Sequence, residues 1–276
     1  MNIRGIDGLA GFARIMSDCD VLVIGAGPGG GSAALTASRK GLSVIVVEAD
    51  PEVGTPVHCG ECLSDLAVQN LNLDLPEEVI ALRCKGIRVI FPDGTEKKLT
   101  ESGYVLEKHL FERWLIDQSI EKGANLHRNH RVTSMERIYN KENQFTNWKI
   151  DGKGDQFPIT CKAVVDASGV SGVASKLLKM PSEVEVIAGF QYEMLEVPND
   201  GYLDFYLWPE YSPHGYVWMI PKEKGRANVG LVTTDKKGAV KYLNQFIDDT
   251  YLKDNPTTNP PWRKEGMKIK PFGGTI

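Results

Sequence analysis

The chain has 276 residues, of which 42% are apolar and 25% charged, as in globular proteins with a sizeable core. Its net charge of −4, without a basic stripe, argues against a nucleic-acid partner, and no apolar run approaches the roughly 20 residues of a membrane-spanning helix. Five dispersed cysteines and an N-terminus without a secretory signal predict a cytoplasmic protein that has no disulfide framework.

The two ends of the chain stand apart from the rest. Residues 1–17 precede the first predicted strand, and we expect them to be an N-terminal extension. At the other end the sequence stops at Ile276 without a closing helix or a polar tail. We therefore expect the chain to be incomplete at its C-terminus.

The first elements form a strand, a tight turn, a helix and a second strand. The apolar run Asp20–Ile24 predicts a buried strand, residues 29–40 predict a helix, and Ser43–Val47 predicts the next buried strand. This order is a βαβ unit, so the sequence predicts an α/β fold with a parallel sheet.

The turn between that strand and helix carries glycine at three spaced positions. Gly25 permits the tight turn, Gly27 lets a pyrophosphate approach the backbone, and Gly30 lets the helix lie close to the strand. Glu48 ends the second strand about 20 residues later, where an acid reaches ribose hydroxyls. The pattern predicts a dinucleotide site, which we expect also to include Pro28, Gly29 and Ala49.

The elements that follow favour FAD over a nicotinamide cofactor. Further βα units would follow directly in a nicotinamide dehydrogenase, whereas this chain has a long loop at Ala49–Ser64 and then a predicted hairpin around Asp93-Gly94. A helix is predicted at Glu107–Lys122, and Asp166-Ala167-Ser168-Gly169 later follows another buried strand. That second turn suits a second contact with a long dinucleotide.

The pattern changes after Pro181. Tyr202–Trp208, Tyr216–Ile220 and Ala227–Val232 predict three successive antiparallel strands, and a helix follows near Leu243. We therefore expect two domains. Residues 18–82 and 101–180 would form the FAD-binding domain, and residues 83–100 and 181–276 a substrate domain built on an antiparallel sheet.

Four stretches carry a resemblance to a known family: Asp20–Gly31 with Glu48, Gly54–Ser64, Val105–Leu115 and Tyr216–Gly230. In these stretches the chain resembles the flavin-dependent geranylgeranyl reductases, including the archaeal digeranylgeranylglycerophospholipid reductases. The resemblance covers Asp18 to Ile276. It implies the p-hydroxybenzoate hydroxylase type of FAD-binding Rossmann-like fold with an antiparallel β-sheet substrate domain.

The same resemblance implies roles for individual residues. Gly25, Gly27, Gly30 and Glu48 would hold the ADP half of FAD, with the following residues completing the cofactor site: Cys59, Gly60, Lys108, Asp166 and Gly169. Cys59 matches the family cysteine beside the isoalloxazine. The lipid site would be formed by Tyr216, Trp218, Pro221 and Tyr206.

The sequence departs from the family at three places. Histidine stands at His58, where arginine is frequent, and isoleucine at Ile220, where phenylalanine is usual. The sequence also lacks the family's later Gly-Asp segment.

The implied reaction is the reduction of isolated C=C bonds in the geranylgeranyl chains of membrane glycerolipids or their precursors. An isolated alkene has no carbonyl to polarise it, so its reduction needs a hydride donor and a proton source together. We interpret Cys59 as a catalytic residue that positions or supplies a proton. An external electron donor, NAD(P)H or a ferredoxin, would be needed, and a lipid substrate is compatible with peripheral membrane contact.

Other interpretations remain at this stage. Cys59 and Cys62 have the spacing of a redox disulfide or are two ordinary loop thiols, and a zinc site is not predicted because Cys84 and Cys161 lack a matching spacing. The strand aromatics would also suit a plain core. An FAD-dependent aromatic hydroxylase of the same fold, or a truncated non-catalytic FAD-binding chain, are the alternative functions.

Overall fold

The computed structural model describes residues 18–181, 187–197, 199–252 and 268–275. For residues 251, 252 and 268–275 only the backbone is described. The predicted extension at residues 1–17 therefore lies outside the described residues.

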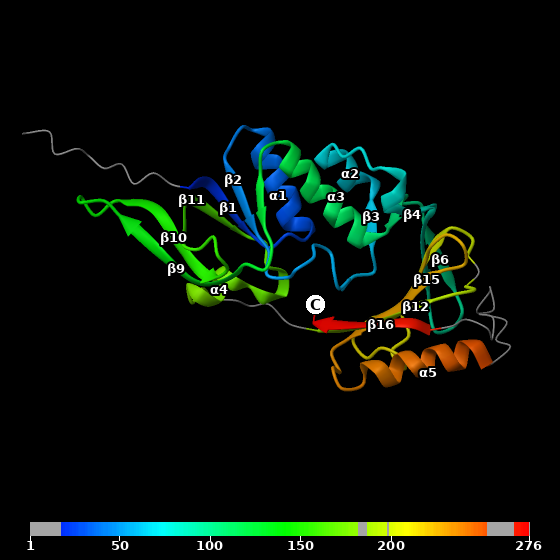
Figure 1. Cartoon of the computed structure of the whole chain (residues 1–276). Helices are drawn as coiled ribbons and strands as arrows, with labels where there is room; N and C mark the ends of the chain where they lie inside the picture. The colour runs from blue at the N-terminus through cyan, green and yellow to red at the C-terminus, as the bar shows by residue number, and fades with distance from the viewer. Residues whose placement is uncertain (1–17, 182–186, 198, 253–267, 276) are drawn as a thin grey trace, which may run out of the picture.

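A six-stranded sheet forms the first layer, and its central strands are parallel, as the sequence predicts (Figure 1). In spatial order its strands are β8 (Asn125–His127), β2 (Val44–Val47), β1 (Cys19–Ile24), β11 (Ile159–Asp166), β10 (Phe145–Lys153) and β9 (Arg131–Tyr139). The apolar runs of β1 and β2 are buried because both faces of these strands are covered.

Two helices lie side by side on one face of this sheet (Figure 1). They are α1 (Pro28–Arg39) and α3 (Lys108–Glu121), close to the predicted bounds. Proline at the first position of α1 suits its start, because the missing N–H has no partner within a helix there. A Cβ on Gly31 would lie 2.9 Å from Leu115, so glycine at this position lets the helices approach closely.

A seven-stranded sheet forms the second part of the molecule. In spatial order it contains β16 (Lys268–Thr275), β12 (Ala188–Met194), β15 (Ala227–Thr233), β14 (Tyr216–Pro221), β13 (Tyr202–Tyr206), β5 (Gly86–Ile90) and β6 (Glu96–Leu99). The three predicted strands form the antiparallel run β13, β14 and β15. The predicted early hairpin is β5 and β6, and β5 joins β13 in parallel.

Short elements connect these parts. A small third sheet contains β3 (Cys62–Ser64), β7 (Gly103–Leu106) and β4 (Ile80–Cys84), and β4 crosses the predicted boundary at residue 82. The remaining helices are α2 (Asp65–Leu71), η1 (Glu77–Val79), η2 (Gly169–Ser171), α4 (Val173–Leu177) and α5 (Ala239–Leu252).

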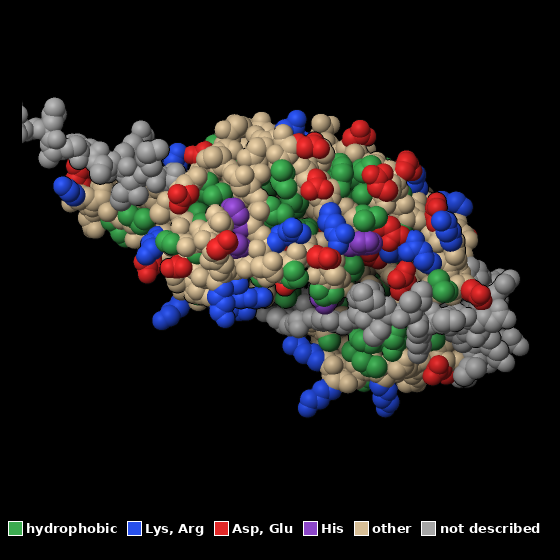
Figure 2. Space-filling view, in the orientation of Figure 1, with side chains coloured by type: hydrophobic (Ala, Val, Ile, Leu, Met, Phe, Trp, Pro, Cys, Tyr) green, Lys and Arg blue, Asp and Glu red, His purple; other side chains and the backbone are tan. Residues whose placement is uncertain are grey.

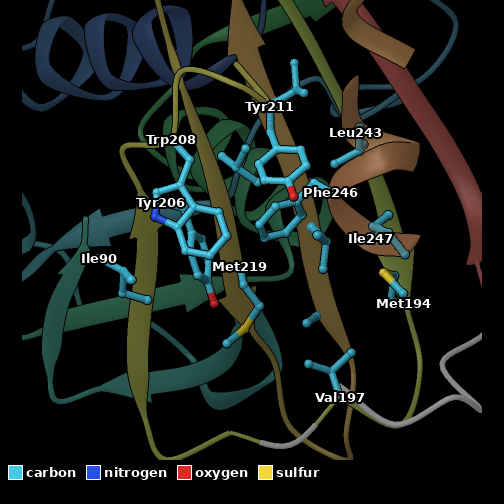
Figure 3. Packing of buried hydrophobic residues seen from close by; sticks show 14 of the residues in the cluster. Ile90, Met194, Val197, Tyr206, Trp208, Tyr211, Met219, Leu243, Phe246 and Ile247 are labelled. Atoms are coloured by element: carbon cyan, nitrogen blue, oxygen red, sulfur yellow. The ribbon is translucent and has the colours of Figure 1, made fainter. Parts of the chain in front are cut away.

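Helix α5 covers the face of the seven-stranded sheet that is turned away from the first layer (Figure 1). Leu243 and Phe246 on α5 are fully buried and lie in one cluster with Met219 of β14 (Figure 3), to which Val217 also belongs. The opposite face, with Trp218 and other alternate residues, therefore points toward the first layer. The predicted alternation along Tyr216–Ile220 is confirmed.

Candidate cofactor and substrate site

The glycine turn between β1 and α1 has the geometry that the spacing predicts. Gly25 has a φ of 97°, and a Cβ on it would lie 2.5 Å from the Ala167 carbonyl oxygen. A Cβ on Gly30 would lie 1.9 Å from the Gly25 carbonyl oxygen, so neither position accepts another residue. A Cβ on Gly27 would meet nothing within 4 Å, which leaves the backbone there open to approach.

The start of α1 fits an anionic group. Gly27 is the N-cap and has no side chain that could cap the first N–H groups, and the first turn, Pro28-Gly29-Gly30, carries no acid. The helix dipole favours negative charge at this end. Pro28 and Gly29 are exposed beside the turn. The residues present therefore fit the phosphates of a dinucleotide.

Glu48 follows β2 and forms a hydrogen bond with the same turn. Its Oε2 accepts the Ala26 N–H at 2.7 Å, and its Oε1 accepts the Asp50 N–H at 2.9 Å. Each carboxylate oxygen has a second lone pair, so these bonds leave Glu48 able to accept ribose hydroxyls. Ala49, the next residue, is half-buried.

Asp166 lies at the end of β11, beside Ile24 at the end of β1. Its Oδ2 accepts the Ala174 N–H at 2.7 Å and its Oδ1 accepts the Ser168 N–H at 3.1 Å, so the carboxylate fixes the following turn. Gly169 in that turn has a φ of 59°. The carboxyl ends of β1, β2 and β11 thus bring Gly25, Glu48 and Asp166 to one edge, where α/β folds bind nucleotides.

The loop that carries Cys59 lies against the seven-stranded sheet. The Gln191 side chain on β12 donates from Nε2 to the Cys59 carbonyl at 2.9 Å, and its Oε1 accepts the Trp218 indole N–H at 3.3 Å. A Cβ on Gly60 would lie 2.8 Å from Ile220 Cδ1, so glycine permits this approach. The Cys59 thiol is half-buried, and its sulfur accepts the Glu61 N–H at 3.2 Å.

An aromatic cluster lines the sheet face that meets this loop. The Tyr216 ring lies 6.0 Å from that of Trp218 and 5.6 Å from that of Phe205. Tyr216 is 38% exposed whereas Trp218 is 6% exposed, so the cluster runs from the surface inward. Burial, and then the charge of the nearby Cys62, raise the pKa of Tyr216. These rings form an apolar surface beside the Cys59 loop.

Two of the residues predicted to bind lipid lie on the other side of the sheet. Tyr206 is 4% exposed and its ring is 5.0 Å from that of Phe246, in the core beneath α5. This placement contradicts its assignment to the lipid site, because the sheet backbone separates it from Tyr216. Pro221 is buried and belongs to the α5 side by the same alternation, which likewise separates it from the aromatic cluster.

Lys108 begins α3 and is engaged within the protein. Its ammonium group pairs with Glu112 one turn further along the helix, and its backbone N–H donates to Glu61 Oε1 at 3.1 Å. A contact between its side chain and the cofactor therefore stays a prediction.

Five residues of this region were not predicted from the sequence: Phe205, Gln191, Glu61, Lys222 and Asn228. Alternation within β13 carries a signal for Phe205, because it lies one residue from Tyr206 and therefore on the opposite face. The four polar residues have no such signal, because their contacts join segments as much as 167 residues apart.

The surface combines both signs of charge. On the face in Figure 2, Lys and Arg side chains are interspersed with Asp and Glu over the described residues. Within the described part of the chain, no helix combines the length and apolar character needed to cross a membrane.

Comparisons with known proteins agree with this geometry. Residues 20–184 match the model of the FAD dependent oxidoreductases, and residues 185–259 match the geranylgeranyl reductase catalytic domain. The digeranylgeranylglycerophospholipid reductase of Methanocella arvoryzae is 35% identical over 255 residues, covering 85% of this chain and 62% of the relative. The enzyme of that name from Thermoplasma acidophilum is 32% identical over 275 residues, covering 95% of this chain and 67% of the relative.

A solved structure supports the same assignment. The crystal structure of a geranylgeranyl bacteriochlorophyll reductase-like protein from Thermoplasma acidophilum superposes with a TM-score of 0.79 at 30% identity, covering 94% of this chain and 66% of that one. The chain spans about 60% of the length of several curated relatives that it matches. On this sequence and structural similarity, the chain belongs to the geranylgeranyl reductase family of FAD-dependent oxidoreductases.

Proposed function

We propose that this chain acts in an FAD-dependent reductase that saturates isolated C=C bonds of geranylgeranyl chains in membrane glycerolipids or their precursors. The observation that carries the proposal is the Gln191 bridge, which joins the Cys59 loop to Trp218. It holds the loop that carries the thiol against an apolar aromatic surface, and the same loop follows Glu48 of the nucleotide-binding edge along the chain. A polyisoprenoid chain needs such an apolar surface, and alkene reduction needs a proton source close to it.

The cofactor contacts follow from the edge where β1, β2 and β11 end. FAD, when bound and reduced, supplies hydride. In this proposal Gly27 and the start of α1 bind the pyrophosphate, and Glu48 accepts the ribose hydroxyls. The full set of residues proposed to contact the cofactor is Gly25, Gly27, Pro28, Gly29, Gly30, Glu48, Ala49, Cys59, Gly60, Lys108, Asp166 and Gly169.

Cys59 and the aromatic cluster have separate tasks. Tyr216, Trp218 and Phe205 bind the isoprenoid chain and exclude water from it, since their rings are continuous from the surface inward. Cys59 holds a proton at Sγ, close to the bound chain. The Glu61 N–H, which donates to that sulfur at 3.2 Å, would stabilise negative charge on it after the proton leaves.

The reaction consumes two electrons and two protons for each double bond, so an external donor is required. We propose NAD(P)H or a ferredoxin for this role. We further propose a cytoplasmic enzyme that contacts the membrane peripherally, with the partly exposed Tyr216 at the entrance for the lipid chain.

The proposal is tested on the whole chain reconstituted with FAD without oxygen. Digeranylgeranylglycerol phospholipid is added after reduction by dithionite, by NAD(P)H or by reduced ferredoxin, and the lipid is followed by mass spectrometry. We expect the lipid to gain hydrogen one double bond at a time, with reoxidation of the flavin absorbance. A reduced flavin that the lipid does not reoxidise, but that oxygen reoxidises in the presence of a phenol, would instead establish an aromatic hydroxylase.

A further inference from the structure

A buried group of polar side chains lies behind the Cys59 loop. Glu61, Lys222 and Asn228 are 5%, 3% and 1% exposed. Glu61 Oε2 lies 2.6 Å from Lys222 Nζ and also accepts a hydrogen bond from the Asn228 amide. Glu61 Oε1 accepts the backbone N–H of Lys108 at 3.1 Å. A carboxylate buried so deeply needs such partners, because an unpaired charge in the interior is costly.

These partners come from different parts of the fold. Lys222 follows β14, Asn228 lies on β15, and Lys108 begins α3. One carboxylate therefore ties the Cys59 loop to two strands of the second sheet and to a helix of the first layer.

The backbone of Glu61 is held in an unusual conformation. Its φ is 73°, in the left-handed region that costs free energy for a residue with a side chain. In this conformation its N–H donates to Cys59 Sγ at 3.2 Å and its carbonyl accepts the Leu106 N–H at 2.8 Å. The buried carboxylate thus anchors a residue whose main chain contacts the thiol directly.

The ion pair of Glu61 and Lys222 is part of a longer row of side chains whose charges alternate in sign. Lys222 Nζ also lies 3.3 Å from Glu107 Oε2, and Arg226 pairs with both Glu107 and Glu193. Burial alone would raise the pKa of Glu107, but the hydrogen bond from Arg226 and the charge of Lys222 lower it overall. Lys222 consequently keeps one carboxylate partner if the charge of Glu61 is removed.

We propose that Glu61 is a positioning residue, whose buried contacts with Lys222 and Asn228 hold the Cys59 thiol beside the aromatic cluster. This role rests on the proposed function, since the place of the thiol matters for alkene reduction only if Cys59 acts there. A purely structural ion pair is the competing explanation. It would contribute to folding without any particular effect at the sulfur.

The test compares two buried carboxylates on opposite sides of the seven-stranded sheet: Glu61, in the loop that contacts Asn228 of β15, and Asp204 of β13. Glu61→Gln removes the charge and keeps the shape of the side chain. Asp204→Asn is the matched control, because Asp204 is 1% exposed and lies 2.7 Å from Arg88 Nε on the α5 side of the sheet. The double variant Glu61→Gln/Lys222→Met leaves Glu107 paired with Arg226 and serves if the single variant folds poorly.

Five quantities are measured on each FAD-loaded chain. The first is the rate of iodoacetamide labelling at Cys59, followed by peptide mass spectrometry up to its high-pH plateau, where access rather than ionisation limits the rate. The other four are the bound FAD per chain, kcat and KM for alkene reduction, and the thermal unfolding temperature.

We expect Glu61→Gln to raise the plateau labelling rate of Cys59 about tenfold, because the released loop opens more often. A misplaced thiol should lower kcat about tenfold or more, with KM and bound FAD within about twofold. Asp204→Asn should lower the unfolding temperature while leaving Cys59 labelling and kcat within about twofold. The double variant should recover thermal stability without recovering kcat.

Unchanged Cys59 labelling in Glu61→Gln, or an equal change in Asp204→Asn, would overturn the positioning role. Labelling decides this point even in the absence of lipid turnover. A wild-type chain that binds FAD but reduces no lipid would defeat the proposed function alone.

Discussion

The two faces of the seven-stranded sheet are built from alternate residues of the same strands, yet they differ in kind. The face beneath α5 has an apolar core that contains Met219 and Phe246 (Figure 3) together with Val217, and the buried Arg88–Asp204 ion pair lies on the same side of the sheet. The face toward the first layer combines aromatic rings with hydrogen-bonded polar side chains such as Gln191 and Asn228.

The difference indicates that one face of the sheet mainly stabilises the fold, whereas the other face mainly forms the candidate site. Apolar packing beneath α5 requires only matching volumes, so it tolerates many sequences. On the other face each polar side chain needs a specific partner, because burial without a hydrogen bond is costly. We therefore expect substitutions beneath α5 to change stability, and substitutions on the other face to change catalysis.

The largest effect on stability should come from Phe246→Ala. Phe246 is 0% exposed, and its ring packs on those of Tyr206, Trp208 and Tyr211. Removing it leaves a cavity and should lower the free energy of unfolding by roughly 3–5 kcal/mol, as measured in urea. At low temperature the remaining folded chain should label at Cys59 at the wild-type rate. A changed rate would mean that the two faces are coupled.

The largest effect on catalysis should come from Cys59→Ala. A positioned proton source contributes roughly 100-fold or more, so kcat for alkene reduction should fall by at least about 100-fold. The thermal unfolding temperature and the bound FAD per chain should change little, because the loop is held through the Cys59 carbonyl, which the variant keeps. Cys62→Ala is the matched control in the same loop region. Equal turnover in Cys59→Ala and wild type would refute the role of the thiol.

Adjacent residues of β13 give the sharpest comparison of the two faces. Phe205→Ala should raise KM for the lipid about tenfold, since it removes an aromatic ring worth roughly 1.5–3 kcal/mol when buried. Tyr206→Phe should leave KM unchanged and lower the free energy of unfolding by about 1 kcal/mol, because it removes only a buried hydroxyl that hydrogen-bonds to Asp204. Lipid titrations and urea unfolding of both variants measure this contrast. A higher KM in Tyr206→Phe alone would reverse the assignment of the faces.

Much of the nucleotide-binding part could be predicted because its signals are local. The spacing of Gly25, Gly27 and Gly30 fixes a turn within six residues, and the apolar run before it fixes the strand. The turn needs no distant partner to be recognised. Its expected geometry at Gly25 and Gly30 agrees with the structure.

The substrate side was harder to predict because its contacts are long-range. Alternation divides Tyr216, Trp218 and Ile220 from Val217 and Met219, but it does not say which set faces α5. Alternation within one strand also does not fix its register with the next strand, and assigning Tyr206 to the lipid site was wrong because the register with β14 places Phe205 opposite Trp218. The ion pair between Glu61 and Lys222 depends on the packing of two layers, and no pattern in the sequence predicts it.

The smallest expected effect distinguishes Cys59 from Cys62. Cys62 is an exposed residue, but burial around its thiol raises the pKa of that group, and the nearby charges of Cys59, Cys84 and Glu61 raise it further. A raised pKa leaves less thiolate at any given pH, so iodoacetamide should modify Cys59 before Cys62 near neutral pH.

The rate of labelling at Cys62 should still be increasing between about pH 9 and 10. A free cysteine, with a pKa of about 8.5, is close to its maximum rate in this range. Peptide mass spectrometry across this range measures both thiols in one sample. Early labelling of Cys62 would mean that the pKa of its thiol is not raised, and Cys62 would then also have to be considered as the proton source.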